Sequence, residues 1–263
     1  MATNAELIQQ GLIHHRQGQP ALAMDRYTEV LRNDPRNADA LYYIAVLACQ
    51  EGQFQQGIDL ARRSLSMQPG QPRAHNVIGQ ALHRQGKIKD ALEAFDEALG
   101  CDINFAEAYG NRANMLSELG RHTEALSSFD RALKLNPNSA NDWLNRGATL
   151  HAMGRTEDAI ASYDRAIALD PELAVAHFNR ANVLHELGRF DDALAGYDRV
   201  LAFAPKLAHA HRGRAAVLSA LGRDEEARAA SEKAAKLEAE LAEKKKKLAE
   251  NQAETAKNTQ GPA

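Results

Sequence analysis

The chain has 263 residues, 25% of them charged, and a formal net charge of −3. No basic stripe follows an expected helix face, so nucleic acid is not the expected partner. No stretch of eighteen apolar residues occurs, which predicts that the chain does not insert into a membrane. The two cysteines form no disulfide framework and the first residues lack a signal peptide, which together predict a cytoplasmic protein.

A glycine recurs every 34 residues along nearly the whole chain: Gly18, Gly52, Gly86, Gly120, Gly154, Gly188 and Gly222. Each glycine lies between two stretches with helical periodicity. There it can adopt the positive φ that ends one helix and lets the next turn back. The spacing therefore predicts seven antiparallel helical hairpins.

Other positions of the hairpin recur with the same period. One holds only small residues: Gly11, Ala45, Gly79, Ala113, Gly147, Ala181 and Ala215. Another is mostly aromatic: Tyr27, Phe95, Phe129, Tyr163 and Tyr197. A proline closes most units, at Pro35, Pro69, Pro137, Pro171 and Pro205. The small residues let the paired helices approach, the ring fills the space beside them, and the proline stands at the turn into the next unit.

This pattern resembles the tetratricopeptide repeat, a helix-turn-helix unit of 34 residues, and it covers about residues 4–241. The resemblance implies an all-α fold, a right-handed superhelical solenoid of seven repeats in which the first helix of each repeat lines a concave groove. We expect residues 1–241 to form this solenoid. Residues 242–263 are rich in Ala, Glu and Lys and are expected to form a polar extension of the last helix and a disordered tail.

Asparagines recur on the expected groove face of the fourth to sixth repeats, at Asn111, Asn145 and Asn179, with Asn114 and Asn182 one turn away. An amide both donates and accepts, so a row of amides can hold the main chain of an extended peptide. The row is similar to that in the repeat domain of O-linked N-acetylglucosamine transferases, whose catalytic domain is missing here. A second interpretation stays open, in which the asparagines bond locally or to water.

The first half of the same face is apolar and aromatic, with Tyr42, Tyr43, Val46 and Val77, and Gln80 occupies the position of Asn114 in the repeat before it. An exposed apolar patch in a groove marks a partner surface. We therefore expect a bound segment with apolar anchors at one end, held by its backbone at the other. The candidate peptide-binding residues are Tyr42, Tyr43, Val46, Val77, Gln80, Asn111, Asn114, Asn145, Asn179 and Asn182.

Two further positions suggest packing and not chemistry. Histidines recur at His15, His83, His151 and His185, but side chains on separate packed helices do not converge to the ~2 Å that a metal needs, so no metal or other cofactor is expected. Arginines recur at Arg112, Arg146, Arg180 and Arg214, each sixteen residues after an aspartate: Asp96, Asp130, Asp164 and Asp198. These pairs are expected to form ion pairs across the boundary between repeats.

The leading functional hypothesis is a protein-interaction scaffold or adaptor that binds an extended peptide segment of a partner. No nucleophile, base and oxyanion donors gather in one pocket and no phosphate-binding loop occurs, so the chain is expected not to be an enzyme. One alternative is a self-associating structural subunit of a larger assembly, and another is a targeting module acting in trans for an enzyme. Leu237, Leu241 and Leu248 leave a short coiled coil open, and the expected state is a monomer or a weak homodimer.

Overall fold

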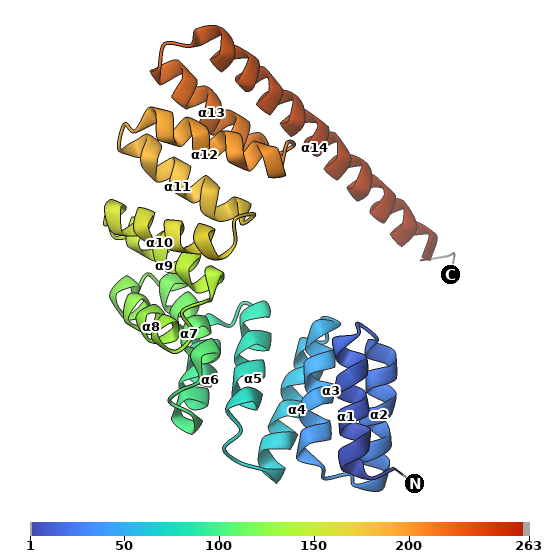
Figure 1. Ribbon diagram of the computed structural model, residues 1–263. Helices are drawn as coiled ribbons and strands as arrows, with labels where there is room; N and C mark the ends of the chain where they lie inside the picture. The colour runs from blue at the N-terminus through green and yellow to red at the C-terminus, as the bar shows by residue number, and fades with distance from the viewer. Residues whose placement is uncertain (1, 260–263) are drawn as a thin grey trace. The chain divides into compact units, whose positions relative to one another are not determined.

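The computed structural model describes the backbone of residues 2–259 and the side chains as far as residue 251. Fourteen helices and no strand occur in this part of the chain (Figure 1). The helices are α1 (Asn4–Arg16), α2 (Pro20–Asn33), α3 (Ala38–Gln50), α4 (Phe54–Met67), α5 (Pro72–Arg84), α6 (Ile88–Cys101), α7 (Ala106–Glu118), α8 (His122–Leu135), α9 (Ala140–Ala152), α10 (Thr156–Leu169), α11 (Ala174–Glu186), α12 (Phe190–Phe203), α13 (Ala208–Ala220) and α14 (Asp224–Thr259). The predicted all-α class and the seven helical hairpins are confirmed.

The chain divides into two compact units, residues 1–142 and 143–263. In the first unit every helix from α1 to α8 packs against the next, and the first helix α5 also contacts the first helices α3 and α7. In the second unit α11 contacts α13 in the same way. The first helices of the hairpins therefore form a continuous side of each unit, which we call the first-helix surface.

The recurring glycines end the first helices as predicted. All seven have positive φ, between 68° and 82°. At Gly120 the amide N–H donates to the Ser117 carbonyl at 3.0 Å, and the next amide, of Arg121, donates to the Leu116 carbonyl at 2.8 Å. This pair of bonds is the Schellman motif, which satisfies the last carbonyls of a helix and requires a residue in the left-handed region.

In the first, third and fifth hairpins the small residue and the ring meet, as the sequence indicated. A Cβ on Gly79 would lie 2.6 Å from a ring carbon of Phe95, and one on Gly147 would lie 2.6 Å from the ring of Tyr163. Both rings are 1% exposed. Glycine is thus required at these two positions because the ring of the second helix rests on the backbone of the first.

Three of the four predicted ion pairs across repeat boundaries are observed, and the pair of Arg146 with Asp130 stays a prediction. Nε of Arg112 lies 2.6 Å from Oδ1 of Asp96, and Arg180–Asp164 and Arg214–Asp198 repeat this distance. Arg112 also donates from its terminal nitrogen to the hydroxyl of Ser128 at 2.6 Å. The guanidinium on α7 therefore links the second helix of its own hairpin to the second helix of the hairpin before it.

The last hairpin differs from the others because its second helix is much longer. Helix α14 has 36 residues against 14 in α12, and its Ala227, Ala230 and Ala234 are buried. The helix runs without interruption past residue 241, where the boundary between the solenoid and its extension was expected. That boundary stays a prediction. The helix extends through Thr259, and the expected disordered tail lies outside the described residues from residue 260 onward.

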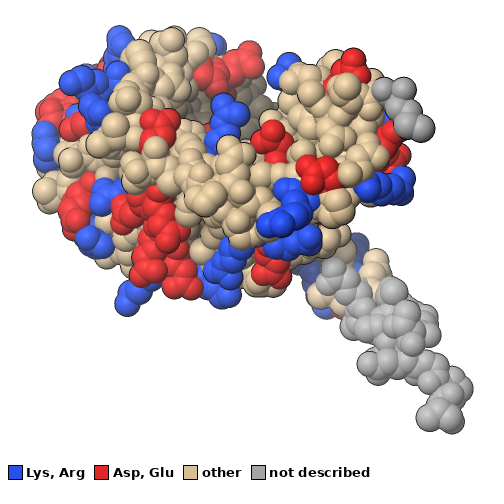
Figure 2. Space-filling view, turned by 90° about the horizontal axis from the view of Figure 1, so that it is seen from below, with Lys and Arg blue, Asp and Glu red and all other residues tan. Residues whose placement is uncertain are grey.

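Charges of both signs are interspersed on the face seen in Figure 2, without a broad field of either sign. Across the described residues, no helix combines the length and the apolar character needed to span a bilayer.

Candidate functional site

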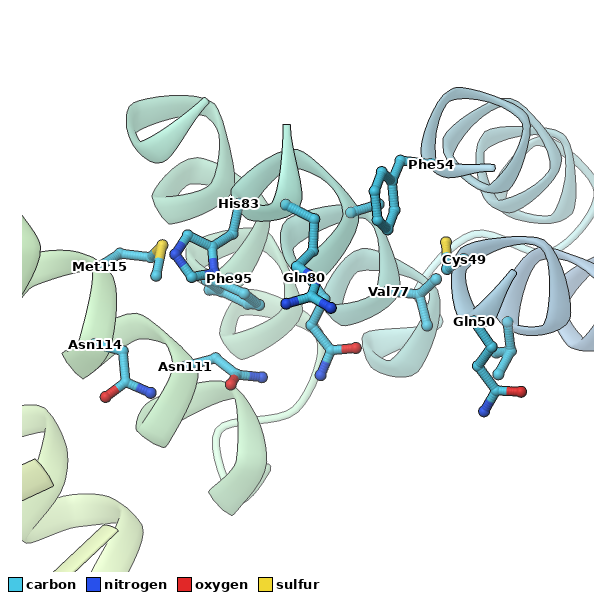
Figure 3. Close-up of a pocket in the computed structure, with 13 residues that line it drawn as sticks. Cys49, Gln50, Phe54, Val77, Gln80, His83, Phe95, Asn111, Asn114 and Met115 are labelled. Atoms are coloured by element: carbon cyan, nitrogen blue, oxygen red, sulfur yellow. The ribbon is translucent and has the colours of Figure 1, made fainter. Parts of the chain in front are cut away.

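A cavity of about 350 Å³ opens on the first-helix surface of the first unit. Val46 and Cys49 of α3 and Phe54 at the start of α4 form one side of it, and Val77 and Phe95 extend its apolar lining. Asn111, Asn114 and Met115 of α7 line it from the other side (Figure 3). We call this space the apolar cavity. Its volume lies within the range of ligand cavities, about 300–1,000 Å³.

Five of the predicted binding residues meet in this one cavity: Val46, Val77, Gln80, Asn111 and Asn114. Val77 is 7% exposed, so it contributes a small part of the wall, whereas Gln80 is exposed at the rim. Their role in binding stays a prediction. The cavity nevertheless combines an apolar floor with amide groups, as in sites that enclose an apolar side chain and bond to the adjoining main chain.

The amides at the rim are linked by hydrogen bonds between α5 and α7. Nε2 of Gln80 and Nδ2 of Asn76 both donate to Oε1 of Glu107, at 3.0 and 2.9 Å. Nδ2 of Asn111 donates to Oδ1 of Asn76 at 2.9 Å. Asn111 therefore already has a local partner, in agreement with the second interpretation of the asparagine row, and it retains its own carbonyl oxygen as an acceptor.

Tyr42 and Tyr43 lie on α3 and are both half-buried. The ring of Tyr43 stacks on Tyr27 with centroids 5.2 Å apart, and Tyr42 contacts Tyr43 edge-on at 5.0 Å. Burial raises the pKa of the Tyr42 phenol. Tyr43 therefore covers the ring of Tyr27 in the hairpin before it and does not project freely into a groove.

A second cavity, of about 370 Å³, lies in the second unit between α9, α10 and α11. It is lined by Ala148, His151, Tyr163, Asn179, Asn182, His185 and Glu186, and we call it the tyrosine cavity. Asn182 accepts a hydrogen bond from the hydroxyl of Tyr197 at 2.6 Å. Asn179 makes no hydrogen bond with any described residue. Asn145 lies on α9 in the same unit and does not line this cavity, and it interacts with another residue.

The two cavities are copies of one arrangement displaced by 68 residues, the length of two hairpins. Gln80, His83, Phe95, Asn111 and Asn114 line the first, and the residues 68 positions later, Ala148, His151, Tyr163, Asn179 and Asn182, line the second. The same positions in the first hairpin pair are Leu12, His15, Tyr27, Tyr43 and Val46. There Tyr43 replaces the asparagine and its ring stacks on Tyr27. The cavity-bearing element is therefore a pair of hairpins.

The recurring histidines bridge the two hairpins of each pair. His15 bonds to Gln50 at 3.0 Å, His83 to Glu118 at 2.8 Å and His151 to Glu186 at 2.7 Å. In each case the partner lies 35 residues further along, on the first helix of the next hairpin. No group of three or more metal-ligating side chains gathers in the part of the chain that has been described.

Several lining residues were not among the predicted ones. Phe54 begins α4, and Cys49 occupies the position taken by histidine in the adjoining hairpins. Tyr163 belongs to the ring position, which the sequence assigned to the core alone. Glycine and alanine alternate at the small position, in the order Gly11, Ala45, Gly79, Ala113 and Gly147. A comparison of the hairpins two by two could therefore have indicated which rings line a cavity.

Sequence profiles of the tetratricopeptide repeat match the chain from residue 8 to residue 207. They cover residues 8–72, 47–105, 106–139, 128–161 and 174–207, and a further profile described as "TPR repeat" matches residues 149–188. One curated relative is the probable UDP-N-acetylglucosamine--peptide N-acetylglucosaminyltransferase SPINDLY of Hordeum vulgare, 29% identical over 112 residues. The match covers 40% of this chain but only 12% of the length of that relative.

Solved structures share the fold. The crystal structure of MamA superposes with a TM-score of 0.60 at 23% identity, covering 63% of this chain and 97% of MamA. YrrB, described as a TPR protein with an unusual peptide-binding site, superposes with a TM-score of 0.59 at 19% identity, covering 70% of this chain and 95% of YrrB. With these matches and the seven hairpins of 34-residue period, the chain belongs to the tetratricopeptide repeat family.

Proposed function

We propose that the chain is a non-enzymatic interaction scaffold that binds an extended peptide segment of a partner protein on its first-helix surface. The observation that carries this proposal is the apolar cavity, because its walls suit one apolar side chain and its rim amides suit the adjoining main chain. YrrB supports the proposal as a protein of the same fold described with a peptide-binding site. We further propose that the scaffold is cytoplasmic, binds no nucleic acid and is monomeric or weakly dimeric.

The rim indicates how the peptide is held. Oδ1 of Asn111 can accept from a main-chain N–H of the peptide, since its Nδ2 donates to Asn76. The bond to Asn76 and the two bonds to Glu107 fix the amides before the peptide arrives. Fixed groups lose less conformational entropy on binding than free ones, so this network favours affinity without contacting the apolar anchor.

Cys49 offers a direct test of the proposal because its thiol lines the cavity. The other cysteine, Cys101, is exposed and is removed first by Cys101→Ser. Random peptides displayed on phage are selected on this variant, and the selected peptides are then assayed for slowing the alkylation of Cys49. Burial raises the pKa of the Cys49 thiol, so alkylation is followed at mildly alkaline pH.

Selected peptides should share an apolar side chain and should protect Cys49. Val46→Glu places a charge on the cavity wall and is expected to abolish both selection and protection, whereas Ile103→Glu, at a residue 64% exposed outside the cavity, should leave both intact. Replacing Asn111, Asn145 and Asn179 together by alanine tests the asparagine row. Peptides that bind without protecting Cys49 and tolerate Val46→Glu would refute the proposal.

One observation favours the alternative of a self-associating subunit. Leu241 and Leu248 on α14 are 54% and 59% exposed and lie seven residues apart on one helix. Sedimentation over a range of concentrations separates the two functions. A mass that rises with concentration and becomes constant in a Leu241→Lys, Leu248→Lys variant would favour assembly through α14.

A further inference from the structure

The hydroxyl of Tyr163 belongs to the tyrosine cavity and has no hydrogen-bond partner among the described residues. Tyr163 is 1% exposed, lines the cavity and makes no hydrogen bond with any described residue. In the next hairpin the hydroxyl of Tyr197 reaches Asn182, fifteen residues earlier. The residue fifteen positions before Tyr163 is Ala148, which also lines the cavity and carries no hydrogen-bonding side chain. The place where an acceptor for this hydroxyl would lie is therefore part of the cavity.

Asn179 supplies a second unused group for a related reason. Its counterpart 68 residues earlier, Asn111, donates to Asn76. The counterpart of Asn76 in the second unit is Leu144, which cannot accept a hydrogen bond. The half-buried amide of Asn179 therefore retains both its donors and its acceptor in the cavity.

The charges around the tyrosine cavity restrict what these two groups can hold. Burial, and secondarily the carboxylate of Glu186, raise the pKa of Tyr163 to about 12, so the phenol is a donor at neutral pH. Glu186 is paired with His151 at 2.7 Å. A second carboxylate would be repelled by Glu186, and an ammonium group would have to compete with His151. An uncharged group that accepts and donates at once fits both Tyr163 and Asn179.

We infer that the tyrosine cavity binds a side-chain carboxamide, that of asparagine or glutamine, in a bound peptide. The carbonyl oxygen of the carboxamide accepts from the Tyr163 hydroxyl, and its amino group donates to Oδ1 of Asn179. The inference rests on the proposed peptide-binding function and assigns the second unit a different selectivity. The apolar cavity has Phe95 in place of Tyr163, so it lacks this hydroxyl.

The test uses the full chain and four blocked tripeptides, in which glutamine, alanine, glutamate or lysine stands between two alanines. Binding is followed through the side-chain amide resonances of Asn179. The glutamine peptide should give a saturable shift and the others a much weaker one. The alanine peptide carries main-chain amides alone, so equal binding of it would overturn the side-chain assignment. Stronger binding of the lysine peptide, or no saturable shift, would overturn the inference as well.

Two variants remove the proposed interaction by opposite means. Tyr163→Phe deletes the hydroxyl and keeps the ring on Gly147, and it should weaken glutamine-peptide binding about two- to tenfold, the worth of one hydrogen bond. Ala148→Asn keeps the hydroxyl but gives it the internal partner that Tyr197 has, and it should weaken binding similarly. Unchanged affinity in both variants would refute the inference.

The apolar cavity makes the two proposals separable. A leucine peptide that protects Cys49 while the glutamine peptide fails at Asn179 would leave the scaffold function standing and remove only the carboxamide site. The reverse result would remove the apolar cavity as the peptide site. Thermal unfolding checks that Tyr163→Phe and Ala148→Asn remain folded. Ala113→Asn places an amide at a buried position outside both cavities, and its unfolding curve serves as the reference for a misfolded chain.

Discussion

The hydroxyl groups of the buried tyrosines have three different surroundings at one position of the hairpin. The hydroxyl of Tyr197 bonds to Asn182, that of Tyr163 has no partner in the tyrosine cavity, and that of Tyr27 is enclosed without a partner. Burial raises the pKa of Tyr27 to about 12. A polar group enclosed without a hydrogen bond lowers the free energy of unfolding, whereas a bonded one raises it. The hydroxyl of Tyr27 is therefore expected to lower the free energy of unfolding, and that of Tyr197 to raise it.

Tyr27→Phe should raise the free energy of unfolding by about 1 kcal/mol, because it removes an enclosed hydroxyl that has no partner. Tyr197→Phe should lower it by about 0.5–1.5 kcal/mol, because Asn182 loses its donor. Urea unfolding of the two variants measures both changes. A loss of stability in Tyr27→Phe would mean that its hydroxyl has a partner in solution.

The ion pairs across repeat boundaries are the second test at this scale. Asp164→Ala should lower the melting temperature, because Arg180, whose side chain is 28% exposed, loses a carboxylate 2.6 Å away. Since Asp164 itself is 52% exposed, we expect the loss to be about 0.5–1 kcal/mol. Asp25→Ala is the control, as Asp25 is exposed and has no partner among the described residues. Equal melting temperatures for the two variants would contradict a structural role for the pair.

At the scale of one helix, glycine has opposite effects at two positions. Gly120 has a φ of 73° in the turn of the fourth hairpin, whereas Gly100 lies in the last turn of α6 with open space where an added methyl group would stand. The first needs the left-handed conformation and the second does not. The two positions can therefore be compared by the same substitution.

Gly120→Ala should destabilise the chain by about 1 kcal/mol or more, because alanine is strained at positive φ. Gly100→Ala should stabilise it by about 0.5–1 kcal/mol, because alanine has the higher helix propensity. Thermal and urea unfolding compare the two variants directly. If Gly120→Ala were as stable as the wild type, the positive φ of the Schellman turn would not contribute to the stability of the chain.

The hairpins could be predicted from the sequence because each is determined by local chemistry repeated seven times. The glycine turns, the ring on the small residue and the Arg112–Asp96 pair follow from single positions with a fixed period. The cavities could not be predicted in this way, because they depend on differences between copies. Contrasts between copies, such as Asn76 with Leu144, Gln80 with Ala148 and Phe95 with Tyr163, distinguish the apolar cavity from the tyrosine cavity, and their effect depends on which side chains meet in space.

On the scale of the whole molecule, helix α14 ends the stack of the second unit in two parts. Its first part packs on α13 through Ala227, Ala230 and Ala234. From Leu241 to Glu250 every side chain is exposed. A terminal repeat needs a covering helix with a polar outer face, and the first part of α14 meets this need.

Truncation after residue 241 should leave the melting temperature within about 2 °C of the full chain, since the residues removed bury little surface. Truncation after Arg223, which deletes α14, should lower the melting temperature strongly and expose α13. Calorimetry of both truncated chains gives the comparison. A large loss on removal of residues 242–263 would show that the exposed part of α14 makes contacts in solution, as a self-associating chain requires.

The repetition of the cavity every two hairpins restricts how a chain of this kind can grow. Duplication of a single hairpin would copy a ring and its small residue together, but only half of a cavity, because the tyrosine cavity takes Ala148 and Tyr163 from one hairpin and Asn179 from the next. Duplication of a pair preserves the alternation and adds a complete cavity. Each added pair can then diverge at a few positions, as the first pair has done with Tyr43. New selectivity therefore arises in steps of 68 residues, without any change to the hairpin itself.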